Sequence, residues 1–126
     1  MSSEPRPRIL IVDDDQDIRE SLEIILNDFG CDVLLAQDGA AGMVRAERDA
    51  PDLVILDLMI PQRSGIAVLD TIKARPSRQL PVIMMSGSTE TRHRELAESR
   101  GADGWLPKPF DIPHFLKTVK GLLPRK

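Results

Sequence analysis

Residues 9–26, ILIVDDDQDIRESLEIIL, join a short apolar run to an amphipathic segment through three consecutive aspartates. A continuous apolar run of this length, bounded by polar residues, is typical of a strand buried on both faces of a sheet. Ile18, Leu22 and Ile25 then recur at helical spacing, and Gly30 ends the segment. The stretch therefore predicts a buried strand that leads directly into a helix, with carboxylates at the junction.

The same alternation continues along the rest of the chain. Further short apolar runs occupy residues 33–36, 53–56, 82–85 and 105–106. Segments with helical features follow them, around residues 40–46, 66–72, 89–100 and 115–123. Strands that alternate with helices in this way favour a parallel sheet joined by right-handed crossovers and covered by helices on both faces. We therefore predict an α/β fold, a three-layer sandwich built from five strand–helix units.

Composition limits the functions that the chain can have. Its 126 residues, 41% of them hydrophobic, suffice for one domain core but not for two. The net charge of −3 and the scattered Lys and Arg residues do not support nucleic-acid binding. The single cysteine, Cys31, fits a reducing compartment, and no apolar stretch approaches membrane-spanning length. We expect one cytoplasmic domain over residues 1–126, with 1–7 as a flexible tail and no nucleic-acid or membrane contact.

Polar side chains stand where four of the five predicted strands end. Asp13 and Asp14 come after the first strand, Asp57 after the third, Ser86 after the fourth and Lys108 after the fifth. In open parallel sheets, ligands bind beyond the carboxyl ends of the strands. We therefore expect these side chains to share one cleft.

The charges expected in this cleft do not balance. Three carboxylates against one ammonium leave an excess of two negative charges. Two like charges about 4 Å apart repel by roughly 4 kcal/mol at an effective dielectric constant of about 20. A divalent cation removes this excess, and oxygen ligands favour Mg²⁺. With the metal bound, a carboxylate can stay ionised and act as a nucleophile toward a phosphoryl group.

Four motifs together resemble the receiver domain of two-component response regulators: ILIVDDD, LVILDLMIPQRSG, VIMMSGS and GADGWLPKPF. They stand in the order of that family and span nearly the whole chain. The resemblance implies a flavodoxin-like, doubly wound five-stranded parallel sheet with strand order 2-1-3-4-5. It also implies a cytoplasmic phosphoprotein of a phosphorelay. Such a protein is a phospho-acceptor that promotes its own phosphorylation and dephosphorylation, and it is not an enzyme in the usual sense.

The resemblance assigns the acceptor and the metal ligands. Asp57 is the implied phospho-acceptor, and Lys108 is implied to pair with Asp57 and later with the phosphoryl oxygens. Asp14, Asp57 and the backbone carbonyl of Met59 are the implied Mg²⁺ ligands. Asp13 is implied to act mainly through a metal-bound water.

The remaining implied roles concern signalling. Ser86 is implied to hydrogen-bond the phosphoryl group, and Trp105 occupies the place of the switch aromatic, which is usually Tyr or Phe in this family. The family usually holds the peptide Lys108–Pro109 in the cis form. Met59 and Ser88 lie where side chains can control access of water to the phosphoryl group, so we expect them to tune the lifetime of the aspartyl phosphate.

The resemblance also implies the partners. A sensor histidine kinase or a histidine phosphotransfer protein would donate the phosphoryl group. A downstream effector protein, or an output domain outside this sequence, would receive the signal. We expect a monomer or a phosphorylation-dependent dimer. The family branch that dimerises through its fourth and fifth helices to bind DNA often carries ADDY at the aromatic, and the ADGW of this chain disfavours that branch.

Two other functions compete with this interpretation. A haloacid-dehalogenase-like phosphohydrolase also uses an aspartyl nucleophile with Mg²⁺. Its D-x-D-x-[TV] motif would fall after the first strand, where DDDQD lacks the final Thr or Val. A receiver-like interaction module that is not phosphorylated is the second competitor. The intact acidic pair, Asp57, Ser86 and Lys108 argue against it, whereas the unusual Trp105 keeps it open.

Some of these residues also have a purely structural interpretation. Asp15 and Asp17 are expected to cap the first helix and to favour its dipole, rather than to bind metal. Ser86 could cap the following helix as well as bind phosphate. Trp105 could simply fill space in the core, as large aromatic side chains usually do.

Overall fold

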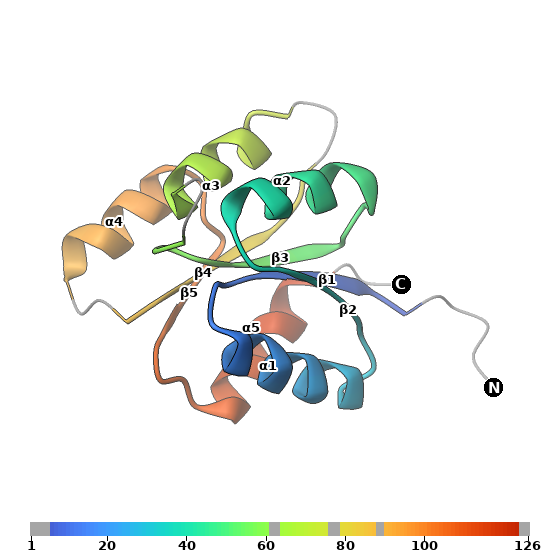
Figure 1. The fold of residues 1–126 in the computed structure, drawn as a ribbon. Helices are drawn as coiled ribbons and strands as arrows, with labels where there is room; N and C mark the ends of the chain where they lie inside the picture. The colour runs from blue at the N-terminus through green and yellow to red at the C-terminus, as the bar shows by residue number, and fades with distance from the viewer. Residues whose placement is uncertain (1–5, 61–63, 76–78, 88–89, 124–126) are drawn as a thin grey trace.

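Five strand–helix units follow one another along the chain, as predicted (Figure 1). The computed structural model describes residues 6–60, 64–75, 79–87 and 90–123. The strands are β1 Arg8–Val12, β2 Asp32–Ala36, β3 Leu53–Asp57, β4 Val82–Ser86 and β5 Gly104–Pro107. The helices are α1 Gln16–Asp28, α2 Gly39–Arg48, α3 Gly65–Lys73, α4 Thr91–Ser99 and α5 Ile112–Leu122. Among the described residues, no helix is long and apolar enough to cross a bilayer.

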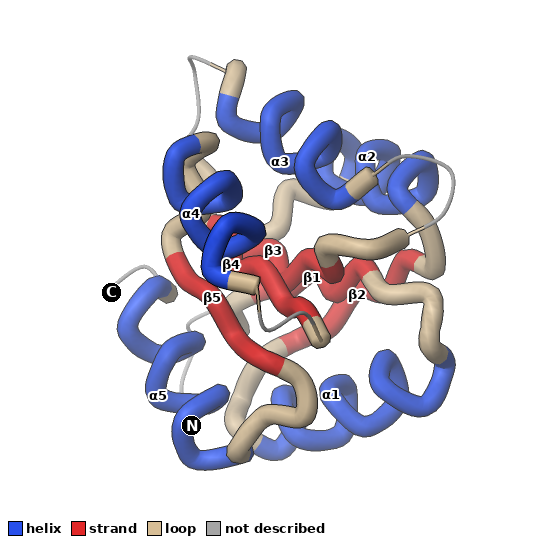
Figure 2. Tube along the Cα trace, turned by 90° about the vertical axis from the view of Figure 1, so that its left-hand side faces the viewer, coloured by secondary structure: helices blue, strands red, loops and turns tan. Residues whose placement is uncertain are grey.

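The strands form one parallel sheet in the order β2-β1-β3-β4-β5. Helices α1 and α5 cover one face of this sheet, and α2, α3 and α4 cover the other (Figures 1 and 2). The predicted doubly wound three-layer sandwich and its strand order are thereby confirmed. The chain reverses its winding direction between β1 and β3, and in such sheets this reversal opens a crevice at the carboxyl ends of the two strands.

The core consists of two layers of apolar side chains, one on each face of the sheet. The layer under α2, α3 and α4 includes Leu10, Val12, Val54, Leu56 and Met84. The layer under α1 and α5 includes Ile9, Ile11, Leu53, Ile55 and Ile83. Successive side chains of a strand point to opposite faces, so a strand covered on both sides must be apolar at every position. This requirement explains the continuous apolar runs in the sequence.

Side chains cap four of the five helices. The Asp15 carboxylate accepts hydrogen bonds from the backbone N–H groups of Asp17 and Ile18, so the structural interpretation of Asp15 is confirmed. Asp38, Ser64 and Asp111 cap α2, α3 and α5 in the same way. In the described part of the chain, α4 differs: it starts without a side-chain capping bond, and its one buried residue is an alanine.

One expectation about element ends needs correction. Asp57 and Ser86 are the last residues of β3 and β4, not residues that follow those strands. Of the residues expected to form a tail at 1–7, Arg6 Nε donates to the Asp32 carboxylate at 3.0 Å and the carbonyl of Pro7 accepts from the backbone N–H of Asp32 at 2.8 Å. Residues 1–5 lie outside the described part.

Candidate functional site

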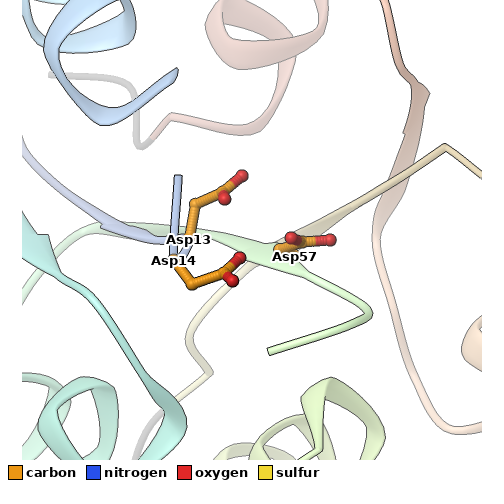
Figure 3. A group of neighbouring side chains, drawn as sticks. All are labelled: Asp13, Asp14 and Asp57. Carbon is orange, nitrogen blue, oxygen red and sulfur yellow. The ribbon is translucent and has the colours of Figure 1, made fainter. Parts of the chain in front are cut away.

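The carboxyl ends of β1 and β3 bring three aspartates together (Figure 3). The two strands are neighbours, with Val12 opposite Leu56, so Asp13 and Asp57 come next on adjacent strands. Asp14 follows directly, where the chain leaves the sheet toward α1. Each of the three residues offers a carboxylate oxygen, and these atoms lie within 4.8 Å of one another. The structure thus assembles the acidic cluster predicted from the strand ends.

The three carboxylates differ in their exposure to solvent. Asp13 is 0% exposed and Asp57 5% exposed, whereas Asp14 is exposed. A ligand that arrives from solvent therefore meets Asp14 first. Asp13 lies at the back of the cluster, where its charge must be balanced by the protein itself.

Lys108 supplies that balance. Its Nζ donates to Asp13 Oδ2 at 2.8 Å and to Asp57 Oδ2 at 3.1 Å, so one ammonium bridges two carboxylates. The backbone N–H of Lys108 donates to the carbonyl of Ser86 at 2.8 Å, which ties the end of β5 to the end of β4. The Lys108–Pro109 peptide is cis, as the family resemblance implied.

Asp13 also accepts hydrogen bonds from two residues that follow it in the sequence. The N–H of Asp15 donates to Asp13 Oδ1 at 2.9 Å, so both carboxylate oxygens of Asp13 accept a hydrogen bond. Arg19 Nη1 donates to the Asp13 backbone carbonyl at 2.7 Å. Sequence reasoning missed Arg19. Its position one turn inside α1, close behind the aspartates, is the signal that could have found it.

The environment of Asp57 disfavours its charged form in the absence of metal. Burial, followed by the nearby negative charge of Asp13, raises the pKa of Asp57 above its usual value, although Lys108 opposes this. Burial acts to lower the pKa of Lys108, but the bonds to Asp13 and Asp57 outweigh burial and the pKa is raised overall. The N–H of Met59 donates to Asp57 Oδ1 at 3.3 Å. Without metal, burial and Asp13 thus act against the charged form of Asp57, whereas the two carboxylates favour the charged form of Lys108.

The two residues expected to transmit a signal lie on β4 and β5. Ser86 is 1% exposed and comes directly after Met85, which is opposite Asp57 in the sheet. Trp105 is opposite Met84 and packs, partly buried, against the core layer on the face covered by α2, α3 and α4. This position on the α4 side is compatible with both interpretations of the indole, as switch and as core residue.

Of the two residues expected to control water access, Met59 and Ser88, the structure describes only Met59. Met59 is 73% exposed and lies beside Asp57. Ser88 lies outside the described residues. The side chain of Met59 is therefore largely open to solvent, two residues after Asp57.

A glycine that sequence reasoning left without a role, Gly65, packs against the backbone at the end of β3. A Cβ added to Gly65 would lie 2.5 Å from the carbonyl oxygen of Asp57 and 2.8 Å from the Cα of Leu58. The N–H of Gly65 donates to the carbonyl of Leu58 at 3.1 Å. The start of α3 therefore lies directly against the backbone of Asp57 and Leu58. The Gly in LVILDLMIPQRSG was the available signal, but its contact is visible only in three dimensions.

The donor atoms of the cluster suit a hard divalent cation. All of them are oxygens, one carboxylate is open to solvent, and Lys108 neutralises only part of the charge. Mg²⁺ prefers a small number of carboxylates together with waters and other oxygen ligands. The residues present therefore fit the ion that the sequence implied.

Comparison with known proteins identifies the family. The model of the response regulator receiver domain family matches residues 9–120. The chain belongs to this family, and it is a receiver domain of two-component signalling. Family membership disfavours the phosphohydrolase alternative.

Individual relatives support the same conclusion. The chain is 38% identical over 121 residues to transcriptional activator protein PfeR of Pseudomonas aeruginosa, covering 96% of this chain and 39% of that protein. It is 36% identical over 118 residues to response regulator MprA of Mycobacterium leprae, covering 94% of this chain and 51% of that protein. The chain thus spans about 39% and 51% of the length of these two curated relatives. The solved structure of Vibrio cholerae chemotaxis protein CheY4 superposes with a TM-score of 0.87 at 28% identity, covering 94% of this chain and 100% of that chain.

Proposed function

We propose that the chain is a phosphorylation-dependent signalling switch with Asp57 as its phospho-acceptor. The observation that carries this proposal is the position of Asp57, which ends β3 beside two further carboxylates and accepts a hydrogen bond from Lys108 at 3.1 Å. A nucleophile, a fixed cation and a cluster of oxygen ligands are the parts that phosphoryl transfer requires.

In this proposal a carboxylate oxygen of Asp57 attacks the phosphorus of a phosphohistidine. A phosphorus–oxygen bond forms, the phosphorus–nitrogen bond breaks, and the imidazole leaves with its bonding electron pair. The product carries roughly two negative charges at neutral pH. Lys108 is already bonded to Asp57 and can contact the phosphoryl oxygens with little movement, while Asp13 keeps the ammonium in place.

Mg²⁺ is the proposed metal ion. Asp14, Asp57 and the backbone carbonyl of Met59 would hold it directly, and Asp13 would act through a metal-bound water. When bound, the ion supplies the positive charge that lets the acceptor stay ionised beside an anionic phosphoryl group. The two hydrogen bonds already accepted by the Asp13 carboxylate support its indirect role, because its oxygens are committed to Lys108 and Asp15.

The proposed output is a changed binding surface around Ser86, Trp105 and α4. Phosphoryl oxygens at Asp57 offer the Ser86 hydroxyl a new partner on the adjacent strand. Trp105 lies on the next strand, on the side of the sheet that α4 covers. Since α4 contributes only Ala97 as a buried residue and starts without a side-chain cap, a small rearrangement can shift its position at low cost.

The proposed donor is a sensor histidine kinase or a histidine phosphotransfer protein. The proposed recipient of the signal is an effector protein or an output domain outside this sequence. The proposal places the chain in the cytoplasm, where receiver domains generally act, and gives it no enzymatic substrate beyond its own phosphorylation and dephosphorylation. The transcriptional role in the name of PfeR belongs to that protein.

Mass spectrometry after incubation with acetyl phosphate and Mg²⁺ tests the proposal. We expect the wild-type chain to gain one phosphoryl group and the Asp57→Asn variant to gain none, because an amide is not the required nucleophile. Full labelling of the variant at another residue would contradict the assignment of the acceptor. A wild-type chain that stays unlabelled would favour the interaction-module alternative, and turnover of a phosphomonoester would favour the phosphohydrolase.

A further inference from the structure

Asp13 is held at each of its polar groups. Its N–H donates to the carbonyl of Ala36 at 3.1 Å, and its two carboxylate oxygens accept from Lys108 and from the N–H of Asp15. The remaining group is the backbone carbonyl, which accepts from Arg19 Nη1 at 2.7 Å. The proposed function uses the bond from Lys108, whereas the bond from Arg19 has no role in it.

Arg19 reaches this carbonyl because of its place in α1. It is the fourth residue of the helix, and long side chains on a helix point back toward the helix N-terminus. A cation at that end is unfavourable for the helix, because it meets the positive pole of the helix dipole. The stability of α1 alone therefore does not explain an arginine that turns back over the start of the helix. The acidic cluster just before α1 supplies a reason for its presence.

The bond from Arg19 fixes the peptide unit between Asp13 and Asp14. That unit is planar, so a bond to its carbonyl oxygen sets the orientation of its N–H at the same time. This orientation determines the direction in which the Asp14 side chain leaves the backbone. Asp14 is exposed, so packing contributes little to holding it. The contact at Asp13 therefore acts on Asp14, the carboxylate that a ligand from solvent meets first (Figure 3).

We infer that Arg19 is a positioning residue that acts through the Asp13–Asp14 peptide and makes the acidic cluster selective for Mg²⁺ over Ca²⁺. This inference rests on the metal ion of the proposed function. Mg²⁺ requires near-ideal octahedral geometry with short metal–oxygen distances, whereas Ca²⁺ accepts variable geometry. A carboxylate held in one direction therefore favours the smaller ion. A carboxylate that is free to turn discriminates less between the two ions.

Charge alone predicts the opposite effect on metal binding. The Arg19 guanidinium is a positive charge bonded to a member of the acidic cluster. Its removal would leave less positive charge near the carboxylates, so a divalent cation would bind more tightly. Loss of positioning weakens binding instead, because groups that orient metal ligands contribute about 10–100-fold to metal affinity. The sign of the change in affinity thus separates the two effects.

Titration of the unphosphorylated chain with Mg²⁺ and with Ca²⁺, followed by backbone amide NMR, tests the inference. We expect Arg19→Met to raise the Kd for Mg²⁺ by roughly tenfold and the Kd for Ca²⁺ by less than about threefold. The amide resonance of Asp14 should also shift in the metal-free variant, since its peptide unit is no longer held. An unchanged or lower Kd for Mg²⁺ in Arg19→Met would overturn the inference, and so would an equal rise for both ions.

Arg8→Met is the matched control. Arg8 Nη1 donates to the backbone carbonyl of Asp49 at 2.8 Å, which is a bond of the same kind at the opposite end of β1. Its loss should lower the melting temperature and leave the Kd for both ions unchanged, because the acidic cluster lies at the other edge of the sheet. A rise in the Mg²⁺ Kd equal to that of Arg19→Met would indicate a general loss of stability and overturn the positioning role.

Arg19→Lys is the conservative variant. It keeps the positive charge on a shorter side chain, so we expect a Kd for Mg²⁺ between those of the wild type and Arg19→Met. This variant also keeps the inference testable if Arg19→Met does not fold. A folded Arg19→Lys chain with no rise in the Kd for Mg²⁺ would overturn the role of Arg19.

The outcomes for the metal, the acceptor and Arg19 can be distinguished. A wild-type chain whose resonances do not respond to Mg²⁺ would refute the proposed metal and this inference with it. Weaker Mg²⁺ binding in Arg19→Met, in a chain that acetyl phosphate never labels at Asp57, would refute the proposed acceptor and leave this inference standing. Labelling of Asp57 with equal Mg²⁺ affinity in the wild type and Arg19→Met would leave the proposed function standing and overturn the role of Arg19.

Discussion

Lys108 Nζ lies 2.8 Å from Asp13 Oδ2 and 3.1 Å from Asp57 Oδ2, so the ammonium is shared between the two carboxylates and is slightly closer to Asp13. The sequence implied a pair of Lys108 with Asp57 and placed Asp13 at the metal. The structure adds that Asp13 anchors the lysine from the back of the site. The charge needed at the acceptor is therefore in place before any ligand binds.

Replacing Lys108 should destabilise the metal-free fold strongly. Lys108→Met leaves the buried carboxylates of Asp13 and Asp57 without their cation, and loss of one partner of a buried ion pair costs about 3 kcal/mol or more. Urea unfolding followed by Trp105 fluorescence measures the free energy of unfolding. Lys117→Met changes an exposed lysine on α5 and should alter it by less than about 0.5 kcal/mol. Equal effects of the two substitutions would contradict the anchoring role.

Replacing the Asp57 carboxylate by a neutral amide should stabilise the metal-free fold, and the gain in free energy of unfolding should depend on pH. The pKa of Asp57 is raised from 3.8 by burial first and by Asp13 second, so the native state holds this proton more tightly than the unfolded state does. The free energy of unfolding therefore falls as pH rises from about 3.8 through the raised pKa. Asp57→Asn removes this loss and should be more stable than wild type at pH 7. Melting curves should show the difference disappearing below pH 4.

Asp14 should determine the response to Mg²⁺. Asp14→Ala removes one of the clustered carboxylates, so the melting temperature without metal should rise by a few degrees. The same change should abolish the stabilisation that Mg²⁺ gives to the wild-type chain by mass action. Differential scanning calorimetry with and without Mg²⁺ checks both results. Asp28→Ala, at the far end of α1, should keep the wild-type response, and a full response in Asp14→Ala would show that Asp14 is not a ligand.

Gly65 should tolerate no side chain. In Gly65→Ala the new Cβ would clash with the backbone of Asp57 and Leu58, so the start of α3 must shift, at a cost of about 1–3 kcal/mol. Because the acceptor moves with it, labelling by acetyl phosphate should slow as well. Gly121→Ala in α5 meets nothing within 4 Å and should instead stabilise the chain by about 0.5–1 kcal/mol. Wild-type labelling and stability in Gly65→Ala would refute the contact.

Trp105 should report the change of state. The chain has one Trp and no Tyr, so its ultraviolet emission is dominated by one indole. Beryllofluoride with Mg²⁺ mimics the phosphoryl group and should change the emission and the quencher access of Trp105. Ser86→Ala should reduce the change, because the hydroxyl that draws the end of β4 toward the ligand is missing. Constant emission despite complete phosphorylation of Asp57 would make Trp105 a plain core residue.

Local sequence patterns were sufficient to predict the fold and to predict which side chains lie at the carboxyl edge of the sheet. Apolar runs without alternation are typical of strands covered on both faces, and their regular alternation with helical segments favours a parallel sheet. In a parallel sheet all strands end at one edge, which is why Asp13, Asp57 and Lys108 could be grouped before any distance was known. The strand order came from the family resemblance, because periodicity is the same for every order.

Contacts within the site depended on the tertiary structure. Lys108 and Asp13 are 95 residues apart in the sequence, and their bond results from the register of four neighbouring strands. The approach of Gly65 to Asp57 depends in the same way on how α3 packs against the end of β3. The sequence by itself determined which side chains reach the carboxyl edge, because chain direction and periodicity are local properties. Which of them touch was decided by the packing of the whole core, which sets distances to fractions of an ångström and has no local signature.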